Sequence, residues 1–354
     1  MSDLRVGIIG TGGFANWHAE QYSGVAGVKL SACFDVDPAR AAEFADKHGF
    51  DHAVSTRDEV FDACDAVSIA TPEDVHAEIV LSALSAGKHV LCEKPLCVTV
   101  EEARAVAEAA RNSPVVHMIN FTKRNAGAVQ EAIRLARSGA LGHIRYLHAS
   151  YFQSWIATRA WGHWTEPHWL WRLRRPAHGE GGALTDIGSH MLDLASAVAG
   201  PLARIRCTLA CLPKMLDGVP VTEYEGRPLD ANDSAIIEIV PSEGGVGVVQ
   251  LTRWAAGVMN QERLELFGTE GAVMIDLAED PHLVRVCRGD GLISGEWEPV
   301  RIQPTPNNIE RFVSAIRENR PGEPDLIRGA QIQYYLDSCE RSAHSGQWAE
   351  TPIA

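Results

Sequence analysis

The 354-residue sequence lacks any long block of lysine or arginine, and its 46 acidic against 32 basic residues give a formal net charge of -14. An acidic surface repels phosphate backbones and anionic headgroups, so nucleic acid and membrane surfaces are poor partners. Also missing is a run of about 18 apolar residues, the length that a membrane-spanning helix needs. No export signal is visible in the first residues, so we expect none. We therefore expect a cytoplasmic protein that binds neither nucleic acid nor membranes.

Paired cysteines and common hydrolytic motifs are missing as well. The eight cysteines stand singly, with no C-x-x-C pair, so the sequence predicts no disulfide framework and no zinc cluster. It has no H-E-x-x-H and no G-x-S-x-G pattern, which disfavours a zinc protease and a Ser-His-Asp hydrolase. We expect buried thiols in a reducing compartment and no bound metal.

Apolar residues are plentiful, at 45% of the sequence, and a chain of this length usually forms more than one core, so two domains are expected. In the first 121 residues, short apolar runs alternate with helical patterns. The expected strands are residues 6–9, 30–34, 66–70, 89–92 and 115–121, and the expected helices are 15–23, 39–48, 76–86 and 100–112. This βαβα order predicts a doubly wound parallel sheet, with a ligand cleft at the carboxyl ends of its strands.

The pattern changes after residue 121. A helix at 126–138 precedes expected strands at 144–152, 205–212, 235–240, 246–254, 262–267 and 272–277, and further helices are expected at 186–198, 307–318 and 327–343. Consecutive strands separated by turns predict a large, mainly antiparallel open sheet. The expected fold class is therefore α/β, with a Rossmann domain at 1–122 and an α+β domain at 123–354 for substrate binding and oligomerisation.

A glycine-rich turn lies between the first expected strand and the first expected helix. Residues 10–15 read Gly-Thr-Gly-Gly-Phe-Ala, which is a G-x-G-x-x-A pattern. Gly10 permits the tight turn, Gly12 lets the backbone approach a pyrophosphate, and the small Ala15 lets the helix pack closely on the strand. The helix N-terminus offers N–H groups to phosphate oxygens. We expect the cofactor to contact Gly10, Gly12, Gly13, Phe14 and Ala15.

Asp35 follows the second expected strand, at about the distance where an acidic residue accepts hydrogen bonds from the adenosine ribose. A carboxylate there repels a 2′-phosphate, so NAD is favoured over NADP, although Arg40 lies close enough in sequence to complicate the argument. Asp35 also fits a turn before Pro38, but Asp37 is the better candidate for the helix cap.

Two loops at expected strand ends carry further signals: Thr71-Pro72 with His76, and Glu93-Lys94-Pro95. Together with the glycine turn, they resemble the Gfo/Idh/MocA oxidoreductase family, named for glucose-fructose oxidoreductase and inositol dehydrogenase. In that family the Glu-Lys-Pro motif supplies an active-site lysine, and the proline peptide bond is often cis. The resemblance implies that Lys94 stabilises negative charge on the reacting oxygen. It also implies a cofactor site formed in part by Thr71, Pro72, His76, Glu93 and Lys94.

The second signature of that family, G-G-x-L-x-D-x-G-x-H, matches residues 181–190. Asp186 and His190 are four residues apart and share a face of the expected helix. The resemblance implies that His190 is the general acid/base and that Asp186 orients the substrate or the histidine. The segment at 120–124 departs from the paired-arginine version found in many relatives, so Lys123 and Arg124 receive no role.

Five of the nine tryptophans crowd residues 155–171. Aromatic rings stack on the C–H faces of sugars, which makes Trp161, Trp164 and Arg172 candidate substrate contacts. Tryptophan and arginine are equally enriched at subunit interfaces, and both interpretations stay open. Arg172, Arg174 and Arg175 would also suit an acidic substrate.

These features predict an NAD-dependent dehydrogenase that transfers hydride between a nicotinamide and a hydroxyl carbon of a sugar, cyclic polyol or related compound. One alternative is an enzyme that holds NAD tightly and uses transient oxidation to cleave a glycoside or isomerise a sugar. Another is a nucleotide-binding sensor without turnover, which the joint presence of Lys94, Asp186 and His190 disfavours. Because the open sheet needs covering and relatives pair through it, a homodimer or homotetramer is expected.

Overall fold

The structure is a computed structural model that describes residues 3–175 and 179–353. The chain divides into two compact units. Unit 1 contains the residues up to 122 together with 306–333, and unit 2 contains 123–305 and 334–353. The chain therefore returns to unit 1 late in the sequence, whereas the prediction assigns all of 123–354 to the second domain.

Within the described residues, the strands of unit 1 form a parallel sheet of six in the order β3-β2-β1-β4-β5-β6. Their bounds are β1 (Leu4–Ile9), β2 (Val28–Phe34), β3 (His52–Ala53), β4 (Ala66–Ile69), β5 (His89–Cys92) and β6 (His117–Ile119). The order reverses between β1 and β4, and in open α/β sheets ligands bind beyond the strand carboxyl ends at such a switch point. The predicted doubly wound sheet is confirmed.

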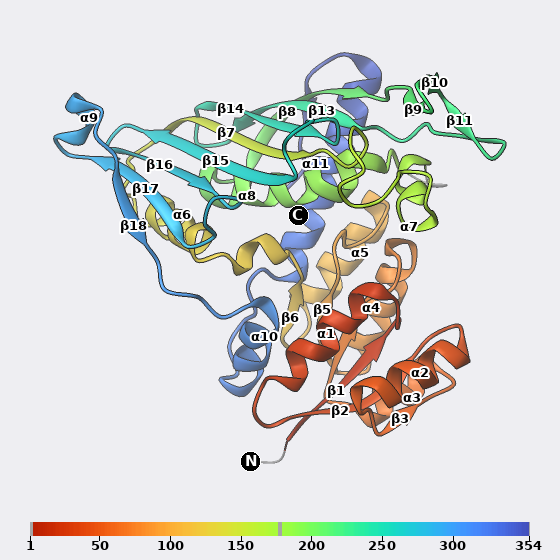
Figure 1. Ribbon diagram of the computed structural model, residues 1–354. Helices are drawn as coiled ribbons and strands as arrows, with labels where there is room; N and C mark the ends of the chain where they lie inside the picture. The colour runs from red at the N-terminus through yellow and green to blue at the C-terminus, as the bar shows by residue number, and fades with distance from the viewer. Residues whose placement is uncertain (1–2, 176–178, 354) are drawn as a thin grey trace. The chain divides into compact units, whose positions relative to one another are not determined.

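The helices of unit 1 alternate with its strands, as Figure 1 shows. They are α1 (Gly13–Ser23), α2 (Pro38–His48), α3 (Arg57–Ala63), α4 (His76–Ser85) and α5 (Val100–Arg111), followed late in the chain by α10 (Asn308–Arg317) and the start of α11 (Leu326–Ser345). α10 belongs to this unit because Ile309, Phe312 and Val313 are buried in one cluster with Ala15 and Ala19 of α1. That apolar contact explains why residues 306–333 return to unit 1.

In unit 2, the described residues form a large sheet of nine strands, in the order β18-β17-β16-β15-β7-β14-β13-β8-β19. The bounds are β7 (Ile144–Gln153), β8 (Leu202–Ala210), β13 (Ser234–Pro241), β14 (Val246–Thr252), β15 (Asn260–Gly268), β16 (Gly271–Asp276), β17 (Leu283–Arg288), β18 (Glu298–Arg301) and β19 (Ala349–Glu350). Its pairings are antiparallel except the parallel pair of β7 and β14. The predicted large, mainly antiparallel sheet is confirmed.

One face of the large sheet is covered and the other is open. Along β13, Ala235, Ile237 and Ile239 are buried, whereas Ile236 and Glu238 are exposed. The helices α6 (Gly127–Arg137) and α8 (Ser189–Ala199) lie along the covered face (Figure 1), and every residue of α8 is buried. No helix in the described part of the chain is long and apolar enough to cross a membrane.

Some elements differ from the prediction. The predicted strands and helices up to residue 112 appear, but the short helix α3 is missing from the prediction although Thr56 and Glu59 form a capping box at its start. The prediction also lacks the strands β17 and β18, which the structure contains. The helix predicted from residue 186 begins instead with a π-helical turn, η4 (Leu184–Gly188), followed by α8. Single π turns often occur at functional sites.

Candidate active site

The glycine turn between β1 and α1 takes a form that requires glycine at Gly10. The φ of Gly10 is 86°, and a Cβ there would lie 2.8 Å from backbone atoms of Ala70 and Thr71. At Gly12 and Gly13, a Cβ would meet nothing within 4 Å. No side chain of the described residues caps the N-terminus of α1, whereas α2, α3, α5 and α10 are all capped. The turn thus offers open space and uncapped N–H groups, which fit a dinucleotide pyrophosphate.

Asp35 follows β2 and is 7% exposed. Its carboxylate accepts hydrogen bonds from the Thr11 N–H at 2.8 Å and the Thr11 hydroxyl at 2.9 Å, from the Asp37 N–H at 3.0 Å, and from the Arg40 guanidinium at 2.5 and 3.1 Å. Burial alone would raise the pKa of Asp35, but these hydrogen bonds, led by that of Arg40, hold it well below its usual range. Asp35 is therefore a preorganised, ionised acceptor beside the turn. Asp37 caps α2, in the predicted role.

The loop after β4 and the turn after β5 are tied together by His76. The ring of His76 is fully buried, with Nδ1 2.8 Å from the Pro95 carbonyl oxygen and Nε2 2.9 Å from the Thr71 carbonyl oxygen. Both nitrogens are thus engaged within the protein, so the predicted contact between His76 and the cofactor has no ring nitrogen to use. The Thr71 hydroxyl, by contrast, is buried without a partner among the described residues, which fits a polar group of the cofactor.

Lys94 lies in the turn directly after β5, and the Lys94–Pro95 peptide bond is cis, as the family resemblance implies. The neighbouring Glu93 carboxylate is 8% exposed and points into the protein. Its Oε1 accepts from His18 Nε2 at 2.8 Å and from Asn120 Nδ2 at 2.5 Å, and its Oε2 accepts from the Lys94 N–H at 3.3 Å. Glu93, predicted to contact the cofactor, therefore uses its side chain to hold the turn that carries Lys94.

In unit 2, Asp186 lies on η4, and the glycines before it make close packing possible. Gly182 has a φ of 64°, and a Cβ there would lie 2.3 Å from the Asn232 carbonyl oxygen. The Asn232 side chain accepts from the Leu184 N–H at 2.8 Å and donates to the Gly181 carbonyl at 2.9 Å. Asn232 thereby fixes the start of the segment that presents Asp186.

Asp186 is bound by two arginines. Arg253, which is fully buried, donates to its Oδ2 at 2.7 Å, and Arg172 Nε lies 3.8 Å from the same oxygen. Arg253 also donates to the carbonyls of Gly182 and Arg172 at 3.3 and 3.2 Å, and its guanidinium lies 5.2 Å from the centre of the Trp155 ring. Ion pairs of this kind suit a carboxylate that accepts hydrogen bonds.

His190 is the second residue of α8 and is 6% exposed. The same helix is anchored by Asp193, whose carboxylate receives two hydrogen bonds of 2.7 Å from the buried Arg124. Arg124 therefore has a structural role: it ties α8, the helix that carries His190, to the turn at Thr122–Asn125. Removing either partner of such a buried pair would leave an uncompensated charge.

A second cluster of polar side chains, formed by Lys123, Glu262 and Tyr151, lies near Asp186. Lys123 forms an ion pair with the buried Glu262, and its ammonium lies 4.9 Å from the centre of the Tyr151 ring. Burial, together with the negative charges of Glu262 and Asp186, raises the pKa of Tyr151 well above its usual value. The Tyr151 hydroxyl is therefore a neutral hydrogen-bonding group next to two carboxylates.

The tryptophan-rich segment is mostly a small core. Trp164 is 2% exposed, clusters with Trp155 and Leu170, and donates its indole N–H to the Met215 carbonyl at 3.1 Å. The predicted stacking of Trp164 on a substrate is thus inconsistent with its packing here. Trp161 is only partly buried and stacks on Trp169, with ring centres 6.0 Å apart.

The arginines of this segment are already engaged. The Arg172 guanidinium lies over the Trp171 ring at 4.3 Å. Arg174 donates to the Tyr224 carbonyl at 2.9 Å, and Arg175 forms a 2.6 Å ion pair with Glu180. Arg174 and Arg175 therefore give little support to an acidic substrate.

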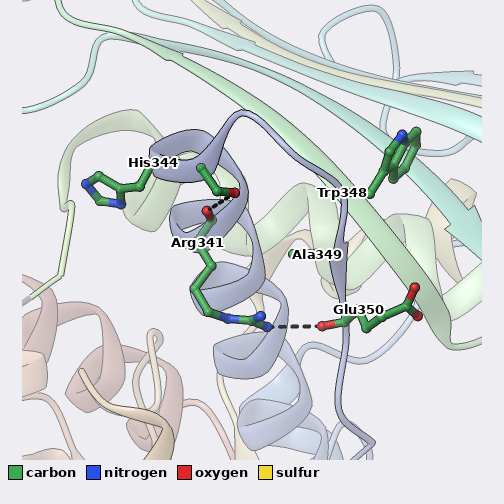
Figure 2. A pocket seen from close by; sticks show the side chains of 6 residues that line it. Arg341, His344, Trp348, Ala349 and Glu350 are labelled. Carbon is green, nitrogen blue, oxygen red and sulfur yellow. Dashed lines mark hydrogen bonds between the residues drawn. The ribbon is translucent and has the colours of Figure 1, made fainter.

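A hollow with a volume of about 670 Å³ lies elsewhere in unit 2, between the end of α11 and β19. Figure 2 shows its lining, in which Arg341 donates to the Glu350 carbonyl at 3.0 Å. Trp348 also lines it, with the Arg204 guanidinium 5.4 Å from its ring centre. The predicted site residues lie outside this lining.

Three features of unit 1 indicate dinucleotide binding. They are the switch point between β1 and β4, the open glycine turn and the ionised acid after β2. The class of protein is therefore a Rossmann-type dinucleotide-binding protein. Comparisons with known proteins narrow this class.

Two family models match the chain: the model described as "Oxidoreductase family, NAD-binding Rossmann fold" at residues 4–121, and "GFO/IDH/MocA C-terminal domain" at residues 129–274. The 1,5-anhydro-D-fructose reductase of Ensifer adhaerens is 34% identical over 76% of this chain and 75% of its own length. The levoglucosan dehydrogenase of Pseudarthrobacter phenanthrenivorans is 29% identical over 99% of each chain. A solved structure of levoglucosan dehydrogenase with NADH and levoglucosan superimposes over 100% of both chains, with a TM-score of 0.86 and 28% identity.

The chain belongs to the Gfo/Idh/MocA family of oxidoreductases, and the family resemblance predicted from its motifs is confirmed. It is an NAD-binding oxidoreductase, which also confirms the predicted cofactor.

Among the residues of these clusters that the sequence-based prediction does not name are Arg253, Asn232, His18 and Asn120. Only Arg253 has a readable signal. In and after β14, alternate residues from Val249 through Leu251 to Arg253 are buried, so a charged residue occupies an inward position of an apolar alternation. Such a residue requires an internal partner.

Proposed function

We propose that this protein is an NAD-dependent dehydrogenase whose substrate is an uncharged pyranoid sugar, such as an anhydrosugar or a glycoside. The observation that carries the proposal is the full-length similarity to levoglucosan dehydrogenase, including its complex with NADH and levoglucosan. The similarity to a reductase of another anhydrosugar supports the same substrate class.

The charges near Asp186 also favour an uncharged substrate. Arg253 and Arg172 both form ion pairs with that carboxylate. Nearby, Lys123 forms an ion pair with Glu262. Cations and carboxylates thus alternate, which provides donors and acceptors for sugar hydroxyls without a strong excess of either charge. Trp161, which is only partly buried, stays a candidate for stacking on the sugar ring.

In the proposed reaction, the Lys94 ammonium donates a hydrogen bond to the hydroxyl oxygen and stabilises the negative charge that develops as the proton leaves. His190 accepts that proton as general base, and returns it when the reaction runs in reverse. Bound NAD supplies the hydride acceptor. The residues that hold it are the turn at Gly10, Gly12 and Gly13, with Asp35 accepting from the ribose hydroxyls.

We assign Asp186 to orienting the substrate. Its carboxylate already receives the Arg253 guanidinium at 2.7 Å, and its side chain is 35% exposed. An ion-paired carboxylate with an exposed edge is well suited to accept a hydrogen bond from a neighbouring sugar hydroxyl.

The test is NADH formation, followed by absorbance, with NAD and NADP in parallel and with levoglucosan, 1,5-anhydroglucitol, a methyl glucoside, myo-inositol and gluconate as substrates. We expect turnover with NAD and an uncharged pyranoid sugar, and a ketone in the product by NMR. Replacement Lys94→Met should lower kcat by roughly a hundredfold or more, whereas Lys29→Met, at an exposed lysine paired with Asp51, should not.

Turnover with gluconate alone would contradict the substrate class, and full activity of Lys94→Met would contradict the assignment of the lysine. Conversion of a glycoside without any free NADH would instead support an enzyme that recycles tightly held NAD. Binding of NADH with no conversion of any sugar would favour a sensor.

Oligomerisation and location belong to the same proposal. The open face of the large sheet exposes Tyr146, Ile236 and Val246, at 43%, 53% and 54%. Exposed apolar side chains spread over one sheet face are typical of an interface, so we assign this face to a homodimer or homotetramer contact. The eight free cysteines suit the reducing cytoplasm.

A further inference from the structure

The Glu93 carboxylate is the centre of a buried hydrogen-bond network in unit 1 that the proposed reaction does not use. His18 of α1 and Asn120, directly after β6, both donate to its Oε1, at 2.8 and 2.5 Å. His18 and Asn120 are fully buried. A carboxylate taken out of water is stable only if such donors replace its hydration, so both side chains are needed to keep Glu93 in place.

The network extends in both directions. On one side, His18 Nδ1 lies 2.7 Å from the Ser68 hydroxyl of β4, which also accepts from the Tyr22 hydroxyl at 3.4 Å. On the other side, Asn308 of α10 donates to Asn120 Oδ1 at 2.8 Å. One carboxylate thus joins α1, β4 and the ends of β5 and β6 to α10.

The bond to Glu93 orients the His18 ring. A carboxylate oxygen only accepts, so His18 Nε2 carries a proton and donates it to Glu93. His18 Nδ1 lies on the other side of the ring, within hydrogen-bond distance of the Ser68 hydroxyl. The donation to Glu93 therefore requires the ring to present Nε2 to the carboxylate.

The other oxygen of Glu93 accepts from the Lys94 N–H at 3.3 Å. The carboxylate therefore connects the backbone of the lysine turn to α1, the helix whose uncapped N-terminus fits the pyrophosphate. The Glu93 carboxylate is thus bonded to α1 through one oxygen and to the turn at Lys94 through the other.

We propose that His18 and Asn120 are positioning residues for catalysis, which hold Glu93 and thereby place Lys94, with His18 linking that placement to the cofactor helix. The inference rests on the proposed role of Lys94. Misplacing a catalytic group by about 1 Å can lower the rate by roughly a hundredfold, so a network remote from the substrate has a measurable effect on kcat.

The experiment uses the full chain with a sugar that supports turnover. His18→Leu removes both hydrogen bonds of the ring, and Ser68→Ala is the matched control because it removes the partner of Nδ1 but leaves the bond to Glu93. We expect His18→Leu to lower kcat by roughly ten- to a hundredfold. The sugar KM and the NADH dissociation constant, from fluorescence titration, should change by less than about threefold, a split that loss of the cofactor site would not give. Ser68→Ala should stay near wild type, and His18→Gln, which can still donate to Glu93, should recover part of the loss.

A double-mutant cycle with Lys94→Met is decisive. If His18 acts through Lys94, His18→Leu has no further effect on turnover once Lys94 is Met, because coupled residues are not additive. Independent, multiplicative losses would overturn the inference, and so would an unchanged kcat in His18→Leu or a loss confined to NADH binding. If His18→Leu does not fold, Asn120→Ala carries the same test. Full turnover of Lys94→Met alone would contradict the proposed function itself, which separates the two failures.

Discussion

Arg253 and Asp35 each combine charge with burial around the proposed chemistry. Arg253 is 0% exposed and donates to Asp186 and to two backbone carbonyls. Asp35 accepts hydrogen bonds from four groups in unit 1: the Thr11 N–H and hydroxyl, the Asp37 N–H and the Arg40 guanidinium. In both cases a charged group is held in one geometry before any ligand arrives, which is the condition for precise recognition.

Replacement Arg253→Met keeps an apolar contact with Trp155 but removes the donors to Asp186 and to the carbonyls of Gly182 and Arg172. Because Asp186 stays partly in water, we expect the free energy of unfolding to fall by only roughly 1–3 kcal/mol. The kcat/KM for the sugar should fall more than the affinity for NADH. Arg263→Met, at a half-exposed arginine paired with Asp276, is the control and should change stability by about 0.5 kcal/mol or less. If urea denaturation showed the same loss of free energy of unfolding in Arg253→Met and in Arg263→Met, the role of Arg253 would be contradicted.

Asp35 predicts a pH dependence of stability. Its pKa is lowered in the folded protein, so its ionised form contributes stability above the ordinary carboxyl pKa of about 3.9. That contribution is lost as the pH falls from there through the lowered pKa. The difference in free energy of unfolding between wild type and Asp35→Asn should therefore be constant from about pH 8 to 5 and narrow below about pH 4. A difference that widens in acid would show the opposite shift.

At the scale of elements, glycine has two different roles in the turn from β1 to α1. Gly10 is needed for the backbone conformation, and Gly12 leaves space for a ligand. Gly10 has a positive φ and would place a Cβ 2.8 Å from the backbone at Ala70, whereas a Cβ at Gly12 meets open space. We expect Gly10→Ala to lower the free energy of unfolding by more than about 1 kcal/mol. Gly12→Ala should keep the melting temperature but weaken NADH binding, because its methyl group enters the space of the pyrophosphate. Normal NADH affinity in Gly12→Ala would mean that the cofactor lies elsewhere.

Much of this architecture could be predicted from periodicity, because β4 is mostly apolar and buried throughout, and burial alternates along β13. The π turn at Leu184–Gly188 could not, since the contacts at its start are tertiary: the Asn232 side chain, distant in sequence, binds the Gly181 carbonyl and the Leu184 N–H. The direction of the Glu93 side chain depends on His18 and Asn120 in the same way. Motifs singled out Lys94 and His190 as candidates, but the residues that hold their segments come from other elements and carry no local signal.

At the scale of the whole molecule, the return of residues 306–333 to unit 1 shows why a single boundary in the sequence was insufficient. The apolar side of α10 packs on α1, and a periodic pattern indicates that a helix has such a side without indicating its partner. The same holds for the open face of the large sheet: its exposed apolar residues indicate a contact surface without indicating the molecule that covers it.

We expect the double replacement of Ile236 and Val246 by Glu to reduce the molar mass in solution toward that of a monomer, because charges would be buried in the proposed contact. Light scattering after gel filtration measures this directly. Ile293→Glu is the control, since Ile293 is 91% exposed on the short helix α9 (Gly291–Ser294), outside the strands of the sheet. A wild-type protein that is already monomeric, or a double variant of unchanged mass, would contradict the assignment of this face.

In the proposed reaction hydride passes from a sugar carbon to NAD, and isotope transfer shows whether it does. The protein is incubated with NAD and a pyranoid sugar deuterated at the carbons that bear its secondary hydroxyl groups, and the nicotinamide is then examined by NMR. We expect one deuterium on the reduced nicotinamide ring together with a ketosugar, and loss of both in Lys94→Met. Conversion of the sugar without deuterium on the nicotinamide, or NADH binding without any conversion, would contradict it.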